Sequence, residues 1–209
     1  MTEIQEAQQL LRTADAVLIS ASNGLSISEG YNIFANNAAF KCYFGDFTRQ
    51  YGITSILQGV QAMLPAPAHQ RFIRQLKQLL ADKDYFVVTS NADQHFQQNG
   101  FAPQKIWEVE GDFFNLKMQS PEWEAQQQAC QDFIRKCADR QLVQLELGIG
   151  ANNQLIKAPL MQMVEAHPHW RYITLNLPQE INVRPAIKDQ TVVLAGDLTQ
   201  TLAQLVKEN

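Results

Sequence analysis

The sequence predicts an α/β protein in which a mostly parallel sheet carries helices on both of its faces. Five short apolar runs have the length and composition of strands that are buried on both faces. Helical patterns lie between most of these runs, and strands that alternate with helices form parallel units. Right-handed crossovers then place helices on both sides of the sheet. With 209 residues, of which 45% are hydrophobic, the chain is long enough for one domain with a core of its own.

The expected elements follow one another regularly along the chain. Apolar residues at helical spacing begin at Ile4, and the continuous run from Ala16 to Ile19 follows directly. We expect strands at 16–19, 85–88, 142–147, 172–175 and 192–195. We expect helices at 3–13, 67–82, 121–139, 157–166 and 197–207. Residues 20–30 are rich in turn-forming residues, and 177–190 have the composition of a surface connection.

Two segments interrupt this alternation. Residues 31–65 hold seven aromatic side chains between Tyr31 and Tyr51, and we expect a small helical insertion that folds over the edge of the sheet. Aromatic residues at this density are more typical of core packing than of a ligand site. Residues 111–121 are predicted to form an irregular hairpin.

Charge and composition exclude several classes of partner. Lys and Arg total 17 against 21 Asp and Glu without a basic block, which argues against nucleic acid and against a polybasic membrane arm. Neither an apolar run of spanning length nor the features of a signal peptide are present. The three cysteines, Cys42, Cys130 and Cys137, form no C-x-x-C motif, so neither a zinc site nor a disulfide framework is indicated. The sequence therefore predicts a cytoplasmic protein with reduced cysteines, of which Cys130 and Cys137 are expected to be buried.

Polar or glycine-rich residues follow every predicted strand. Because ligands of open parallel sheets bind at the carboxyl ends of the strands, these segments are candidates for one common site. They are 22–30, 89–93, 148–153, 176 and 196–197. The first segment has the glycine and serine content of a phosphate-binding loop but also of an ordinary surface loop. Asn91 and Asp93 have the chemistry to bind a ribose or an amide, and they are equally the residue types that cap helices.

Taken together and in order, these segments resemble those of the sirtuins, the NAD-dependent deacylases and ADP-ribosyltransferases. The family's phosphate loop, G-A-G-x-S-x-x-S-G, corresponds to residues 22–30, and its T-Q-N-x-D motif corresponds to 89–93. Its H-G pair falls on Glu110 and Gly111, and its G-T-S loop on Gly148, Ile149 and Gly150. Its strand-end Asn falls on Asn176, and its late Gly-Asp pair on Gly196 and Asp197. The resemblance covers about residues 14–207.

The resemblance implies one Rossmann-like sirtuin domain over residues 1–209. In it, 31–65 would be the small helical subdomain and 111–121 a remnant of the zinc module, without metal because Met118 stands where a first cysteine is expected. The chain is most similar to the macrodomain-linked bacterial class, called class M, with which it shares 145–150, 156–159 and 110–113. That class transfers ADP-ribose from NAD to proteins. The resemblance therefore implies NAD, a protein acceptor such as a lipoylated carrier protein, and a macrodomain hydrolase as a partner.

The positions at which the chain departs from the family pattern favour one of the two sirtuin activities, ADP-ribosyl transfer, over the other, deacylation. Glu110 replaces the catalytic histidine, and a glutamate, with a pKa of about 4.3 in water, is a poor general base. A carboxylate at this place would instead stabilise the positive charge that develops when nicotinamide leaves, which favours ADP-ribosyl transfer over deacylation. Glu110 has the simpler alternatives of capping a loop or pairing with a lysine. Ser22 and Asn23 replace a glycine and an alanine, and the arginine that follows the family's loop is missing near Ala35.

Two sets of site residues follow from the resemblance. The catalytic set is Asn91, Asp93 and Glu110. The NAD-binding set is Ser22, Asn23, Gly24, Ser26, Gly30, Thr89, Ser90, Gly148, Gly150, Asn176, Gly196 and Asp197. The alternative is a catalytically degenerate binder of NAD or ADP-ribose, because side chains at 22 and 23 crowd a pyrophosphate. His95 is expected to be a solvated residue on a surface helix.

Overall fold

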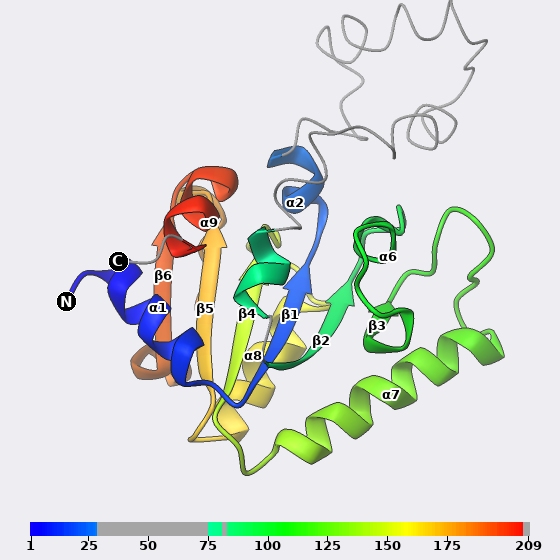
Figure 1. Ribbon diagram of the computed structural model, residues 1–209, viewed down its shortest axis with the longest axis horizontal. Helices are drawn as coiled ribbons and strands as arrows, with labels where there is room; N and C mark the ends of the chain where they lie inside the picture. Colours follow the sequence, from blue (N-terminus) through cyan, green and yellow to red (C-terminus); the bar gives the residue numbers. More distant parts are fainter. Residues whose placement is uncertain (29–74, 81–82, 207–209) are drawn as a thin grey trace, which may run out of the picture.

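The computed structural model describes residues 1–28, 75–80 and 83–206, which are built around a six-stranded parallel sheet (Figure 1). The strands are β1 (Ala16–Ala21), β2 (Asp84–Thr89), β3 (Ile106–Glu108), β4 (Leu142–Leu147), β5 (Arg171–Asn176) and β6 (Thr191–Ala195). They lie across the sheet in the order β3-β2-β1-β4-β5-β6. The order reverses between β1 and β4, and this switch point is where open α/β sheets bind ligands.

The register of the strands brings their carboxyl ends to one edge. Ala21, the last residue of β1, is paired with Thr89 on one side and with Leu147 on the other. Asn176 at the end of β5 is paired with Ala195 at the end of β6. The segments that follow the strands therefore start at the same level and lie side by side.

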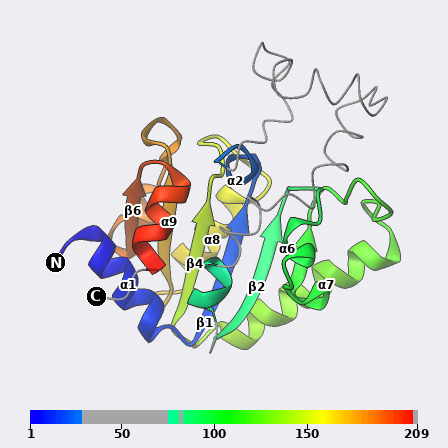
Figure 2. The same cartoon turned by 45° about the horizontal axis from the view of Figure 1, so that its top comes forward.

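Two hydrophobic clusters fill the two faces of the sheet. Helices α1 (Glu3–Thr13) and α9 (Leu198–Val206) pack on one face, where Leu11 and Leu202 join a cluster with the β1 residue Ile19. Helices α7 (Pro121–Cys137) and α8 (Lys157–Ala166) pack on the other, where the β1 residue Leu18 belongs to a second cluster. Figure 2 shows α1 and α9 together on one side of the sheet, with α7 running across the opposite side. Alternate residues of β1 thus face different helices, as a strand buried on both faces requires.

Local sequence explains where the long helices begin. Thr2 and Gln5 form a reciprocal capping box at the start of α1. Ser120 accepts the Trp123 N–H at the start of α7, and Pro121 occupies the first helical position, where no N–H is needed. The shorter elements are α2 (Asn23–Ser28), α6 (His95–Gln98), η1 (Pro103–Lys105), η2 (Pro178–Glu180) and η3 (Pro185–Gln190), and residues 75–79 are also helical.

The structure confirms the α/β prediction, the five expected strands and the helices near both termini. It corrects three details. Residues 106–108 form a sixth strand at the edge of the sheet, β1 continues to Ala21, and 23–28 form a helix where a turn-rich segment was expected. The insertion expected at 31–65 lies outside the described residues, as do 67–74 of the helix expected at 67–82. Cys130 and Cys137 are buried in the second cluster as expected, and burial raises the pKa of the Cys130 thiol to about 12.

The segment expected to be an irregular hairpin is a loop organised around Asp112. One carboxylate oxygen of Asp112 accepts the N–H groups of Phe114, Asn115 and Leu116, at 2.9, 2.7 and 2.8 Å. Partial burial raises the pKa of this carboxyl, but the hydrogen bond from the Gln94 amide and those from the three backbone N–H groups outweigh burial and hold the pKa below its usual value. In the described residues we find no group of three His, Cys, Asp or Glu that would hold a metal ion. The helices of that same part of the chain are all too short or too polar to cross a membrane.

Candidate functional site

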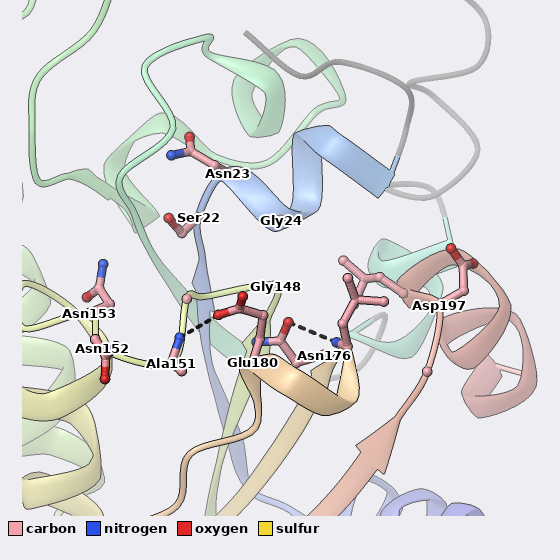
Figure 3. A pocket seen from close by; sticks show the side chains of 14 residues that line it. Ser22, Asn23, Gly24, Gly148, Ala151, Asn152, Asn153, Asn176, Glu180 and Asp197 are labelled. Carbon is pink, nitrogen blue, oxygen red and sulfur yellow. Dashed lines mark hydrogen bonds between the residues drawn. The ribbon is translucent and has the colours of Figure 1, made fainter. Parts of the chain in front are cut away.

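A cavity of about 690 Å³ opens at the carboxyl ends of β1, β4, β5 and β6 (Figure 3). Its volume lies within the range of small-molecule sites. The described residues that line it are Ser22, Asn23, Gly24, Gly148, Gly150, Ala151, Asn152, Asn153, Asn176, Leu177, Glu180, Gly196, Asp197 and Leu198. Eight of these are predicted NAD-binding residues, so the fold brings four separate stretches of the chain to one cavity.

The end of β1 lies directly against the end of β4. The Gly24 N–H donates to the Gly148 carbonyl over 2.9 Å, and a Cβ on Gly24 would lie only 2.3 Å from that oxygen. Gly148 has a φ of +61°, a left-handed conformation that favours glycine. Both glycines are therefore explained by the close approach of the two backbones. The N–H of Gly24 is used in this contact and is not available to an anion, whereas the Ser22 and Asn23 side chains also line the cavity.

A second wall of the cavity is formed by the segment after β4 and the segment after β5. The Asn176 amide donates to the Ile149 carbonyl over 2.7 Å, and the Glu180 carboxylate accepts the Ala151 N–H at 2.8 Å. The Asn182 amide donates to the Ala151 carbonyl, also at 2.8 Å. Glu180 is not among the residues predicted for the site, because 177–190 have the composition of a surface connection. The one feature of the sequence that could have indicated Glu180 is its place four residues after Asn176, the residue at the end of a strand.

The lining of the cavity is acidic. Glu180, after β5, and Asp197, after β6, each contribute a carboxylate (Figure 3), and none of the lining residues that the structure describes is Lys or Arg. Asp197 also accepts the Gln200 N–H at 2.9 Å near the start of α9. A negative lining favours ligands that present hydroxyl or amino donors, such as a ribose or an adenine.

The end of β2 holds a buried amide without a partner. Asn91 is 5% exposed, and neither its side-chain oxygen nor its nitrogen has a hydrogen-bond partner among residues 1–28, 75–80 and 83–206. An unsatisfied buried amide costs about 1–3 kcal/mol and calls for an explanation such as a ligand or a role in a reaction. Asn91 does not line the cavity described above. The Ser90 hydroxyl nevertheless donates to the Ser22 hydroxyl over 2.8 Å, which links the end of β2 to that cavity.

Thr89 and Asp93 make local contacts around Asn91. The Thr89 hydroxyl accepts the Asn91 N–H at 3.0 Å, and the Asp93 carboxylate accepts the His95 N–H at 3.0 Å at the start of α6. The capping alternative therefore applies to Asp93. His95 is 3% exposed, which corrects the expectation of a solvated histidine: the short helix α6 packs inward, and Phe96 beside it is also buried.

Two glutamates near the end of β3 differ sharply in environment. Glu110, the predicted catalytic carboxylate, is exposed in the turn after the strand. Glu108, which the sequence did not single out, is 2% exposed, and burial raises its pKa from 4.5 to about 7. The Asp112 and Asp93 carboxylates raise it further, whereas hydrogen bonds with Gln97 and Gln126 act against the rise. The remaining predicted residues, Ser26 and Gly30, cannot be placed, since the described part of the chain lacks the Ser26 side chain and all of Gly30.

Comparison with known proteins finds a weakly similar ADP-ribosyltransferase and solved structures with the same fold. No model of a protein family matches the chain. A protein ADP-ribosyltransferase of Staphylococcus aureus (strain Mu50) is 20% identical over an alignment 287 positions long, which covers the whole of this chain and 90% of that protein. A solved complex of Sir2 with a p53 peptide and NAD⁺ has a TM-score of 0.59 at 14% identity, covering 98% of this chain and 97% of that one.

The chain has the fold of the Sir2 sirtuins. A Sir2 structure from work on the mechanism and regulation of Sir2 enzymes has a TM-score of 0.60 at 15% identity, over 99% of this chain and 96% of that one. A Sir2 complex with the inhibitor EX-527, 2′-O-acetyl-ADP-ribose and a deacetylated p53 peptide gives the same score and identity over 96% of both chains. The solved Sir2 structures with this fold therefore include one complex with NAD⁺ and one with 2′-O-acetyl-ADP-ribose.

Proposed function

We propose that this chain binds NAD in the strand-end cavity and transfers ADP-ribose from it to a protein acceptor. The observation that carries the proposal is the convergence of eight predicted NAD-binding residues, from four stretches of the chain, on one cavity of about 690 Å³. The Sir2 fold and the name of the staphylococcal relative support it. In this proposal the chain belongs to the zinc-lacking, macrodomain-linked bacterial class.

The cavity would hold the ADP half of NAD. Asn176 and the acidic residues Glu180 and Asp197 suit the hydroxyl and amino donors of adenosine. Ser22 and Asn23 would offer neutral donors to the pyrophosphate, since the Gly24 N–H is already used by Gly148.

The nicotinamide half would extend toward the end of β2. Asn91 is the side chain best suited to meet it, because a ligand would satisfy the two amide atoms that lack partners in the described structure. Asp93 and Glu110 complete the proposed catalytic set. The Glu110 carboxylate would stabilise positive charge at the anomeric carbon as the bond to nicotinamide breaks.

The acceptor follows from the same assignment. We propose a protein acceptor, with a lipoylated carrier protein as the first to be tested and a macrodomain hydrolase as the partner that reverses the modification. Glu110 in place of a histidine makes deacylation the weaker alternative, because glutamate is a poorer general base than histidine.

One observation favours a second function, a binder of NAD or ADP-ribose without catalysis. Ser22 and Asn23 both line the cavity, so their side chains occupy space beside the proposed pyrophosphate position (Figure 3). A protein that retains the adenosine wall but not the reaction would bind nucleotide and release no nicotinamide.

Calorimetric titration with NAD, followed by a nicotinamide-release assay and transfer of labelled ADP-ribose to acceptor proteins, separates these functions. Binding with release and transfer supports the transferase, and binding alone supports the binder. Gly150→Phe tests the location, because a side chain at Gly150 would stand beside Glu180 without a backbone clash. It should abolish binding, whereas Asn115→Phe in the exposed Asp112 loop should not. Absence of any NAD or ADP-ribose binding by the unmodified chain would refute the proposal.

A further inference from the structure

A lysine and a glutamate form a buried ion pair beside the sheet. The Lys157 ammonium lies 3.0 Å from a carboxylate oxygen of Glu146, and their side chains are 1% and 0% exposed. Glu146 is on the central strand β4, and Lys157 is the first residue of α8. Neither residue lines the cavity.

Stability alone does not explain this pair. Removing two charges from water costs several kcal/mol, and apolar residues of similar size often serve a fold as well. A cation in the first turn of a helix also opposes the helix dipole. The site nevertheless satisfies both groups: Thr174 donates to Glu146 over 2.8 Å, and the Tyr172 hydroxyl donates to its other oxygen.

The other contacts of Lys157 indicate what the pair does. Its ammonium also donates to the Ile149 carbonyl at 3.4 Å and to the Glu180 carbonyl at 3.2 Å. Ile149 lies in the segment after β4 and Glu180 in the segment after β5, and these two segments form one wall of the cavity. Lys157 therefore donates hydrogen bonds to both segments that form this wall. The Ile149 carbonyl oxygen accepts a hydrogen bond from Lys157 and another from the Asn176 amide.

We propose that Lys157 and Glu146 are positioning residues, which hold segments 148–153 and 177–182 at the spacing that the adenosine half of the cavity requires. Glu146 fixes the ammonium, and the ammonium fixes the two carbonyls. The Ala151 N–H then meets the Glu180 carboxylate across the wall at 2.8 Å. The expected effect on adenosine binding rests on the proposed function, whereas the claim that the pair holds the two segments in position does not.

The test compares two variants by amide hydrogen exchange and by ADP-ribose titration. Glu146→Gln with Lys157→Met removes the pair without leaving an unpaired charge. The matched control is Ser20→Ala, which removes a buried 2.6 Å hydrogen bond to Gln144 on the same central strands but contacts neither segment of the wall. The free energy of unfolding of both variants is first measured in urea. Changes in Ala151 exchange and in ADP-ribose affinity are then compared after each variant's loss of stability has been taken into account.

For the double variant we expect exchange of the Ala151 amide to rise about tenfold and the ADP-ribose Kd to rise about tenfold, while strand amides change little. If nicotinamide release is measurable, KM for NAD should rise and kcat should change by less than about twofold. Ser20→Ala should leave Ala151 exchange and ADP-ribose affinity unchanged. Unaltered Ala151 exchange in the double variant, or an equal rise in Ser20→Ala, overturns the inference. Failure of the unmodified chain to bind ADP-ribose would refute the proposed function instead and leave the exchange result to decide the inference.

Discussion

The Cβ position of Gly24 lies 2.3 Å from the carbonyl oxygen of Gly148, so that the turn after β1 and the turn after β4 are in direct backbone contact. This contact sets the floor of the cavity at the switch point of the sheet, between the two strands where the order reverses. It also makes two cavity glycines differ in a measurable way, because the atom nearest to the Cβ position of Gly150 among the described residues, apart from its two chain neighbours, is 3.7 Å away.

Gly24→Ala should therefore destabilise the protein by about 1–3 kcal/mol, since a backbone oxygen cannot move aside as a flexible side chain does. Gly150→Ala should change the free energy of unfolding by less than about 0.5 kcal/mol. Urea denaturation of both variants measures this difference. Equal stabilities for the two would show that the β1 and β4 turns are not in contact.

Glu108 should make stability depend on pH. Its pKa is raised from 4.5 to about 7, so the native state binds more protons than the unfolded state between these values. The contribution of Glu108 to stability should therefore be fully present below about pH 4.5 and be lost as pH rises through 7, by an amount on the order of 3 kcal/mol. Glu108→Gln, which mimics the protonated form, should be more stable than the unmodified chain at pH 8 and similar to it at pH 4.

Glu110→Gln is the matched control for that experiment. Glu110 is exposed and only two residues away, so its variant should track the unmodified chain at every pH. Urea titrations at pH 4, 6 and 8 give the comparison. A stability difference between Glu108→Gln and the unmodified chain that stays constant across this range would contradict the assignment of a raised pKa.

The same Glu110→Gln variant tests the proposed chemistry. Removing a group that stabilises charge in a transition state reduces the rate by about a hundredfold or more. We therefore expect a loss of this size in nicotinamide release and ADP-ribosyl transfer, with NAD affinity nearly unchanged because the adenosine contacts are elsewhere. Full activity of the variant would remove Glu110 from the catalytic set.

Asn91→Leu should separate stability from ligand binding. Because both amide atoms of Asn91 lack partners in the described residues, an apolar side chain of similar shape should leave stability unchanged or raise it by about 1 kcal/mol. Nicotinamide release should nevertheless fall. Asn176→Leu is the contrast, since it removes the bonds to Ile149 and Leu177 and should cost about 1–3 kcal/mol. Loss of stability in Asn91→Leu as large as in Asn176→Leu would show that Asn91 is a structural residue.

The sequence predicts the buried strands well because strands covered on both faces are rich in apolar residues, although β4 also buries Gln144 and Glu146. It misses β3, which has only three residues, one of them Glu108, and pairs with a single neighbour. It predicts most of the cavity lining, since parallel strands must present their carboxyl ends at one edge. It misses Glu180, whose role depends on a tertiary hydrogen bond to Ala151, and it cannot distinguish Glu108 from Glu110, because the two differ in burial.

A crystal structure of the chain soaked with ADP-ribose tests the central claim most directly. The account predicts adenosine against Gly150, Asn176 and Asp197, with the pyrophosphate beside Gly24 and the distal ribose directed toward Asn91. A cavity that stays empty at saturating ADP-ribose, or a nucleotide bound elsewhere on the protein, would contradict it.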